Sequence, residues 1–319
     1  MRQTYNFSFK STEFSEETWS ALRSLVDEFY APNKAYSGAT SSHWQKYGQY
    51  QNAEFHNNEF LELKGLGFGD YENRHNLKFL NYLINIPMTF AVQICLMGLS
   101  KDLRTSIKDL AVKSKRVLNP DFLRLALLTQ NISEYIKENA ISKVMIVGDG
   151  FGTFGSILSK IHPELTIVQV NLGRTLIFDL AFSSISIPHK SHILVRDLPE
   201  VIDHAVNYLP AEDLHNIDQG IELFIAVESF QEMDIQTVQN YFKLMRLQTC
   251  PVFVYLVSRL TKILPDGTEV RLEEYGWSES DKTLFQRLSW YVNWGVRRRP
   301  PFIFRMDGKT EERLVSISK

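Results

Sequence analysis

The sequence has only 2 cysteines, Cys95 and Cys250, among its 319 residues. Two thiols are too few for a disulfide framework or for a zinc site built on cysteine alone, so we expect reduced thiols and a cytoplasmic protein. Charge of one sign is also lacking, because 35 Lys and Arg residues stand against 37 Asp and Glu residues, for a net charge of −2. This near-neutral balance argues against a basic nucleic-acid binder.

Long apolar runs are missing as well. The most apolar stretch, residues 83–99, contains Asn85, Pro87 and Gln93, and it is shorter than the ~20 residues that a membrane-spanning helix needs. The N-terminal residues carry no apolar segment of the secretory-signal type. The sequence therefore predicts a soluble chain with no membrane span.

Histidines at metal-binding spacing are lacking too. The sequence has 8 histidines, and no two of them form a His-x-x-x-His pair, so we predict no metal site. There is also no Gly-x-Ser-x-Gly signature of a serine nucleophile. His43 is distinguished from the other histidines only by its place beside Trp44, in a segment that we expect to act as a lid.

The pattern of the chain changes near residue 139. Before it, helical periods predominate, and residues 31–73, rich in glycine, asparagine and aromatics, are expected to form a long loop or lid with short helices. Helices are expected over residues 14–30, 75–99, 101–116 and 120–138. We predict a helical N-terminal substrate or lid region over residues 1–138 and an α/β cofactor-binding domain over residues 139–319.

Short apolar runs alternate with helical stretches in the second part. Nearly continuous apolar strands with crossover helices indicate a parallel sheet covered on both faces, which is a doubly wound, Rossmann-like fold. The last two runs flank Asp307-Gly308, a turn signal that predicts an antiparallel hairpin. The predicted strands are Val144–Val147, Thr166–Val170, His192–Val195, Leu223–Val227, Val252–Val257, Phe302–Arg305 and Leu314–Ile317.

The strongest chemical signal is VMIVGDGFGTFG, from Val144 to Gly155, in which a strand leads into four glycines and then a helix. Glycine lets a backbone approach a ligand closely, and a helix N-terminus at the carboxyl edge of such a sheet attracts anions. Two cofactor classes fit. The spacing Gly150-x-Gly152-x-x-Gly155 matches the dinucleotide fingerprint, and S-adenosylmethionine (SAM) is held at a similar strand-turn-helix.

The order of elements resembles class I SAM-dependent methyltransferases, whose glycine-rich loop follows the first strand and whose seventh and last strand is antiparallel. Two segments further resemble a family of sugar O-methyltransferases from bacterial surface-polysaccharide gene clusters. One is IVGDGFG at residues 146–152 followed by VNLG at 170–173, and the other is ELFIAVESFQEM at 222–233. That family tends to show Ser-x-Gln-Glu-Met after the fourth strand, as Ser229 to Met233 do here, together with a helical N-terminal extension. The likeness covers about residues 142–319.

The resemblance implies SAM as the cofactor and a set of residues at the strand ends. For the cofactor these are Gly148, Asp149, Gly150, Phe151, Gly152, Asn171, Leu172, Asp197, Glu228 and Ser229. For catalysis they are Glu232, as the base that takes the acceptor proton, and Glu228 beside it. For the acceptor they are Gln231, Arg259, Tyr275 and Trp277, to which we add Trp44 from the aromatic segment that we expect to act as a lid.

Structural alternatives stay open for several of these residues. Asp197 equally suits a helix N-cap, and Glu232 could instead cap the helix expected over residues 234–246 through the helix dipole. Arg259, Tyr275 and Trp277 are also compatible with ordinary packing.

Two departures from the methyltransferase pattern keep other functions open. The acidic residues that are usual two positions before the first glycine and at the end of the second strand are replaced by Ile146 and Asn171. The leading hypothesis is methylation of a sugar hydroxyl, nucleotide-linked or glycan-bound. The alternatives are an NAD-type oxidoreductase and a non-catalytic protein that retains the fold. A small-molecule sugar partner is expected, and a homo-oligomer is left open.

Overall fold

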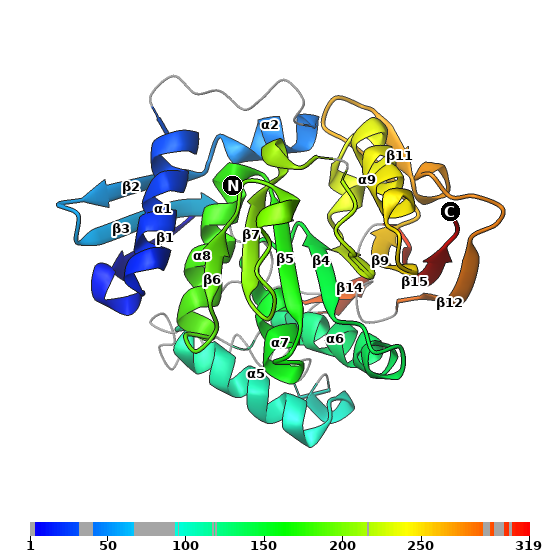
Figure 1. The fold of residues 1–319 in the computed structure, drawn as a ribbon, viewed down its shortest axis with the longest axis horizontal. Helices are drawn as coiled ribbons and strands as arrows, with labels where there is room; N and C mark the ends of the chain where they lie inside the picture. The colour runs from blue at the N-terminus through cyan, green and yellow to red at the C-terminus, as the bar shows by residue number, and fades with distance from the viewer. Residues whose placement is uncertain are drawn as a thin grey trace.

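The computed structural model describes residues 4–31, 41–66, 93–94, 96–116, 118, 120–215, 217–289, 294–296, 303–305 and 308–319. An 8-stranded sheet forms its centre, in the order β12-β15-β9-β8-β4-β5-β7-β6 (Figure 1). The strands from β9 to β6 are parallel, whereas β15 runs antiparallel to both β9 and β12. Their bounds are β4 (Lys143–Val147), β5 (Thr166–Asn171), β6 (His192–Leu194), β7 (Val206–Pro210), β8 (Leu223–Val227), β9 (Val252–Arg259), β12 (Lys282–Leu288) and β15 (Thr310–Ile317).

Helices cover both faces of this sheet. Alternate residues of β4 point to opposite sides, because side chains of a strand alternate. Val144 and Ile146 lie in a core with α5 (Lys101–Lys113), α6 (Pro120–Glu138), α7 (Thr153–Ile161) and α8 (Gly173–Ser186). Met145 and Val147 lie in a second core with α9 (Ile235–Leu247). The fold is therefore the expected α/β class, a large and mostly parallel Rossmann-like sheet with an antiparallel last strand.

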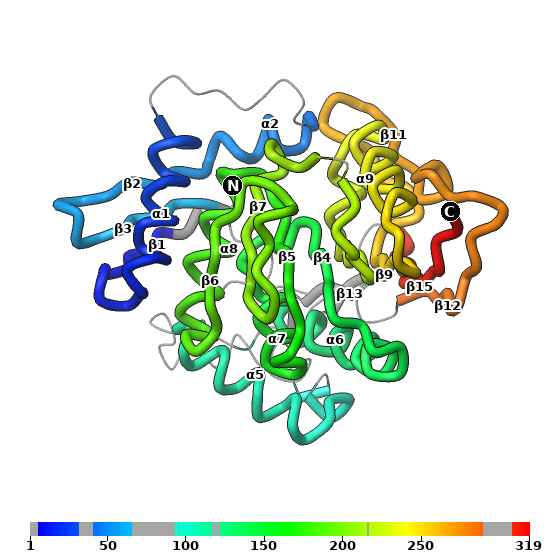
Figure 2. Tube along the Cα trace, in the orientation of Figure 1, coloured from blue at the N-terminus to red at the C-terminus, as the bar shows by residue number. Residues whose placement is uncertain are grey.

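The N-terminal part combines helices with a small sheet. It contains α1 (Glu16–Phe29), α2 (Ser42–Gly48) and a 3-stranded antiparallel sheet of order β1-β3-β2, which lies at one side of the molecule (Figure 2). The strands are β1 (Thr4–Lys10), β2 (Asn52–His56) and β3 (Phe60–Leu66). Phe7 and Phe9 of β1 pack edge-on against Phe182 of α8, so this sheet shares the core of the α/β part.

Several sequence predictions are confirmed. The helices expected near residues 14–30, 101–116 and 120–138 correspond to α1, α5 and α6, and Ser15 caps α1 by accepting a hydrogen bond from the Thr18 amide. The predicted runs at β4, β5, β6, β8, β9 and β15 are all strands. The helix expected over residues 75–99 falls mostly outside the described residues.

Other predictions need correction. The predicted terminal hairpin is wrong, because β14 (Ile303–Arg305) pairs with β13 (Trp294–Val296), while β15 pairs with β9 and β12. The large sheet has eight strands, since β7 and β12 were not predicted as strands. Residues 51–66, expected to belong to a loop, form the β2-β3 hairpin.

The edge pair β6-β7 buries a histidine whose charge state couples pH to stability. His192 is 6% exposed, and its Nδ1 lies 2.8 Å from the Tyr208 hydroxyl. Burial lowers the pKa of His192 from its ordinary value near 6.5 to about 4. Between these two pH values His192 is therefore protonated in the unfolded chain and neutral in the folded chain.

We expect the free energy of unfolding to fall by on the order of 3 kcal/mol as the pH drops from about 6.5 to about 4. His192→Gln should flatten this slope, whereas His56→Gln, at a histidine with 43% side-chain exposure, should keep it. Urea unfolding at several pH values measures the effect. A variant lacking His192 that shows the wild-type slope would contradict the assignment.

Candidate functional site at the carboxyl ends of the strands

The glycine-rich turn directly follows β4 and has a backbone that glycine favours. Gly148, Gly150 and Gly152 have φ angles of 75°, 89° and 60°, a region that other residues adopt at a cost. A Cβ on Gly148 would lie 2.7 Å from the Cβ of Ser229, which follows β8. The turn is therefore packed directly against the end of the neighbouring strand.

Asp149 caps the helix that the turn leads into. Its Oδ1 accepts a hydrogen bond from the Phe154 amide at 2.9 Å, and its Oδ2 accepts one from the Gly155 amide at 2.7 Å. The Asp149 carboxylate thus occupies two of the free amides in the first turn of α7. These two amides are therefore not available to an anionic ligand, contrary to the expectation for this helix N-terminus. A ligand at the turn must meet the backbone before α7.

A buried carboxylate that sequence reasoning missed braces the turn. Asp179 of α8 is 0% exposed, and its Oδ1 accepts a hydrogen bond from the Gly152 amide at 3.0 Å. Its Oδ2 accepts a second one from Asn171 Nδ2 at 2.8 Å. Asp179 therefore links the glycine turn after β4 to the end of β5. Its only sequence signal is a lone acid within the apolar run FDLAF.

Two residues predicted to touch the cofactor face inward. The Asn171 amide points to Asp179, and its Oδ1 accepts a hydrogen bond from the backbone amide of Leu172, the next residue. Phe151 is 1% exposed and packs edge-on against Phe7 and Phe182. The structure places Phe151 in the core that joins the turn to the N-terminal sheet.

The missed strand β7 changes which acidic residue stands beside the end of β5. β7 pairs with β5 and leads into Ala211–Asp213, where Glu212 Oε2 accepts a hydrogen bond from the Gly173 amide at 3.0 Å. Asp197 follows β6, one strand further out, and caps Leu198–Glu200 through the Leu198 amide at 2.8 Å. The N-cap alternative for Asp197 is thus the arrangement seen, and Glu212 supplies a carboxylate next to Asn171.

The end of β8 carries an unusual backbone. Glu228 has a φ of 56° and donates its amide to the Val257 carbonyl at 2.7 Å. Ser229 Oγ donates to the Val147 carbonyl at 2.5 Å. A left-handed glutamate costs roughly 1–2 kcal/mol, and such residues cluster at functional sites. These two hydrogen bonds, one from Glu228 and one from Ser229, fix the end of β8 beside the glycine turn.

Glu232 lies at the centre of a small charged cluster. Its Oε1 accepts a hydrogen bond from Lys262 Nζ at 2.8 Å, and its Oε2 lies 3.3 Å from His43 Nε2 of α2. The helix that follows, α9, is capped instead by Asp234, whose side chain accepts a hydrogen bond from the Thr237 amide, so capping of α9 does not explain Glu232. Sequence reasoning missed Lys262 because it comes from β10 (Thr261–Ile263), a strand we had not predicted.

The remaining acceptor candidates separate into two groups. α2 brings Trp44 to the strand ends together with His43, with the two rings 5.4 Å apart. Gln231 Oε1 accepts a hydrogen bond from the Arg259 amide at 2.8 Å, which fixes the end of β9.

The other two acceptor candidates lie on the α9 side of the sheet. Tyr275 is 0% exposed and bonds Ser258 Oγ through its hydroxyl, and Trp277 donates to the Leu272 carbonyl. Both residues pack with the core under α9. Tyr275 also lies edge-on to Phe230, two residues before Glu232, with the two rings 6.0 Å apart.

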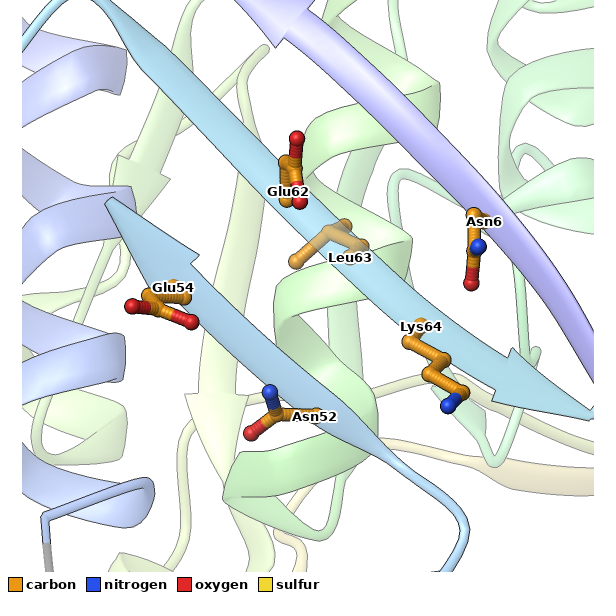
Figure 3. A pocket seen from close by; sticks show the side chains of 6 residues that line it. All are labelled: Asn6, Asn52, Glu54, Glu62, Leu63 and Lys64. Carbon is orange, nitrogen blue, oxygen red and sulfur yellow. The ribbon is translucent and has the colours of Figure 1, made fainter. Parts of the chain in front are cut away.

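The described residues offer few other kinds of site. Within them, no group of three or more His, Cys, Asp or Glu side chains is arranged to hold a metal ion. None of the helices in that part of the chain has the length and apolarity to cross a membrane. A pocket of about 130 Å³ lies on the polar face of the N-terminal sheet, lined by Asn6, Asn52, Glu54, Glu62, Leu63 and Lys64 (Figure 3).

Fold and site together define an open α/β protein with a glycine-rich turn at the carboxyl edge of its sheet. No protein-family model matches the chain, and no curated protein matches its sequence.

Solved structures with a similar arrangement include the following three chains. The plantazolicin methyltransferase BpumL, in complex with SAH, is 9% identical with a TM-score of 0.40, covering 76% of this chain and 100% of that one. The mitomycin 7-O-methyltransferase MmcR is 9% identical with a TM-score of 0.36, covering 61% and 57%. WbdD is 16% identical with a TM-score of 0.37, covering 60% and 39%. The chain thus spans just over half of MmcR and well under half of WbdD, and the fold class rests on the strand order above.

Proposed function

We propose that the chain is a SAM-dependent O-methyltransferase whose acceptor is a sugar hydroxyl, nucleotide-linked or glycan-bound, in the cytoplasm. The observation that carries the proposal is the contact between the glycine turn and Ser229. β4 lies between β5 and β8, and the chain order reverses there. Ligands of open α/β sheets bind at such a switch point, outside the carboxyl ends of the strands.

The residues around the turn suit the polar groups of SAM. Gly148 and Gly150 offer backbone without a side chain, and Glu212 offers a carboxylate beside the end of β5, where Asn171 has none. A carboxylate that accepts a ribose hydroxyl or the adenine amine makes a charge-assisted hydrogen bond, roughly twice as strong as a neutral one. Glu212 thereby weakens the case, raised by Ile146 and Asn171, for a protein that keeps the fold without binding.

The acceptor side requires a proton acceptor. SAM, when bound, supplies an electrophilic methyl group, and the chain must align the hydroxyl with it and remove the hydroxyl proton. Glu228 and Glu232 both follow β8, and Ser229, which lies between them in the sequence, contacts the glycine turn. A sugar is favoured because residues 146–152 and 222–233 resemble the sugar O-methyltransferase family. Residues 1–138 would then form the substrate or lid region and residues 139–319 the SAM-binding domain.

Ligand titration tests the cofactor. We expect SAM and S-adenosylhomocysteine to raise the melting temperature, because a ligand at 100 times its Kd adds about 2.7 kcal/mol to the free energy of unfolding. NAD at the same concentration should leave the melting temperature unchanged. Calorimetry gives the matching Kd values.

Each other outcome points to one alternative. A melting temperature raised by NAD alone would favour the oxidoreductase. A melting temperature unchanged by both SAM and S-adenosylhomocysteine would contradict the proposed methyltransferase function. Binding of SAM without transfer to any nucleotide sugar would favour the non-catalytic protein.

A further inference from the structure

A histidine from the N-terminal region meets the cluster at the end of β8. His43 Nε2 lies 3.3 Å from Glu232 Oε2, and Lys262 Nζ lies 2.8 Å from Glu232 Oε1. The three side chains are 13%, 24% and 14% exposed for His43, Glu232 and Lys262. They come from α2, the segment after β8, and β10, so residues far apart in the chain build one partly buried group.

The position of His43 is fixed by its surroundings. Ser41 Oγ donates a hydrogen bond to the backbone carbonyl of Glu232 at 2.5 Å, which anchors the start of α2. The imidazole ring lies edge-on to the rings of Tyr47, at 4.6 Å, and Trp44, at 5.4 Å. The ring therefore has a defined orientation relative to the carboxylate.

The contacts of Glu232 make it better suited to hold a neighbour than to receive a substrate proton. Each of its oxygens already faces a donor, one the Lys262 ammonium and one the His43 ring. A hydroxyl that gave its proton to Glu232 would have to displace one of these contacts. A neutral imidazole that donates from Nε2 has its lone pair on Nδ1, and a carboxylate at Nε2 stabilises the imidazolium that forms.

We propose that His43 takes the proton of the acceptor hydroxyl and that Glu232, held by Lys262, is a positioning residue; this inference rests on the proposed methyl transfer. The hydroxyl oxygen forms a bond to the methyl carbon as the bond from that carbon to sulfur breaks. The bonding electrons stay on sulfur, leaving neutral S-adenosylhomocysteine. The hydroxyl proton moves to Nδ1 of His43, and the imidazolium later releases it to water.

The acceptor side is thus built from two parts of the chain. The carboxylate comes from the α/β part, whereas the proton acceptor comes from α2. A chain without α2 would keep the glycine turn and lose the group that completes the reaction.

The test uses the full-length protein with labelled SAM and three probes, UDP-glucose, UDP-N-acetylglucosamine and GDP-mannose. His43→Ala should lower kcat by roughly 10²–10⁴-fold and leave the Kd of SAM within about twofold, and added imidazole should restore part of the rate. His56→Ala is the matched control, because His56 also pairs with a carboxylate, Glu62, at 3.4 Å, but on the N-terminal sheet. It should keep the wild-type kcat.

The pH profile separates the positioning residue from the proton acceptor. Wild-type kcat should fall below a single midpoint as the imidazole becomes protonated. Glu232→Gln should retain transfer at a reduced rate and move that midpoint to lower pH, because the imidazolium loses its carboxylate. A purely structural role would lower the rate without moving the midpoint. His43→Asn, which keeps a polar side chain of similar size, should lose the same rate as His43→Ala. Circular dichroism of both variants should match the wild type, which would show that the lost rate is not a folding defect.

Three results would overturn the inference. The first is a His43→Ala protein with kcat within threefold of the wild type. The second is a Glu232→Gln protein that loses as much rate as His43→Ala at every pH, which would make Glu232 the proton acceptor. The third is a wild-type protein that binds SAM and methylates none of the probes, which would leave only the cofactor site standing. A wild type that does not bind SAM would instead remove the proposed function itself.

Discussion

Replacing Gly152 with alanine should lower the free energy of unfolding by about 2–5 kcal/mol and weaken SAM binding. The new Cβ would lie 2.0 Å from Ser183 Oγ and 2.7 Å from the Asp179 carbonyl oxygen. Overpacking of this kind costs about 1–3 kcal/mol, and the left-handed backbone at φ 60° adds about 1–2 kcal/mol for any residue with a Cβ. Relief of the clash would shift the turn that we place against the cofactor.

Gly220 provides the matched control for this substitution. Its φ is 65°, yet a Cβ there would meet nothing within 4 Å. Gly220→Ala should therefore cost only the backbone part, about 1–2 kcal/mol, with no change in SAM affinity. Urea unfolding and calorimetry of the two variants measure the difference. Equal losses for both would show that the packing of Gly152 is unimportant.

Asp179→Ala should be the most damaging change outside the turn. It would leave the Gly152 amide and the Asn171 side-chain amide without their acceptor in a fully buried place. Unsatisfied buried donors cost about 1–3 kcal/mol each, so we expect a loss of about 3–5 kcal/mol. Because Asp179 braces the end of β5 against the turn, the Kd of SAM should rise at least tenfold.

A partly exposed aspartate supplies the comparison. Asp109 of α5 pairs with Lys113 and Lys160 at about one-third exposure, and such pairs contribute less than about 1 kcal/mol. Asp109→Ala should leave the Kd of SAM unchanged. If Asp179→Ala cost no more than Asp109→Ala, the bracing role would have to be abandoned.

The central strands could be predicted because they are short and almost wholly apolar. The strand β7 was not predicted, because Asn207 and Pro210 interrupt its apolar pattern. The structure buries Asn207 completely and satisfies its amide with the carbonyls of Ile167 and Ile202. Polar residues that find partners inside the fold are invisible to periodicity alone.

In β15, buried charged residues likewise cannot be recognised from the sequence pattern. The sequence run TEER reads as exposed, yet Glu312 is 0% exposed, since Arg287 binds it at 2.8 and 2.9 Å and the Tyr255 hydroxyl at 2.6 Å. The partner strand β12 was not predicted, so nothing in the sequence indicated a cation opposite Glu312. Buried charges require such partners.

The residues of the candidate site also fall into those that a local motif predicts and those that it does not. The glycine turn and Glu232 could be predicted because each belongs to a local motif beside an apolar strand. Asp179, Glu212 and Lys262 could not, because their roles depend on which elements lie side by side. That neighbourhood follows from strand order, which a single sequence does not determine.

The hydrogen bond from Ser41 to Glu232 joins positions 191 residues apart. Contacts of such sequence separation form late, because the entropy of closing a long loop opposes them until the rest of the chain is in place. During synthesis, α2 leaves the ribosome long before β8 and β10 exist. Docking of α2 on the segment after β8 would thus be among the last steps of folding, and it would complete the cluster of His43, Glu232 and Lys262.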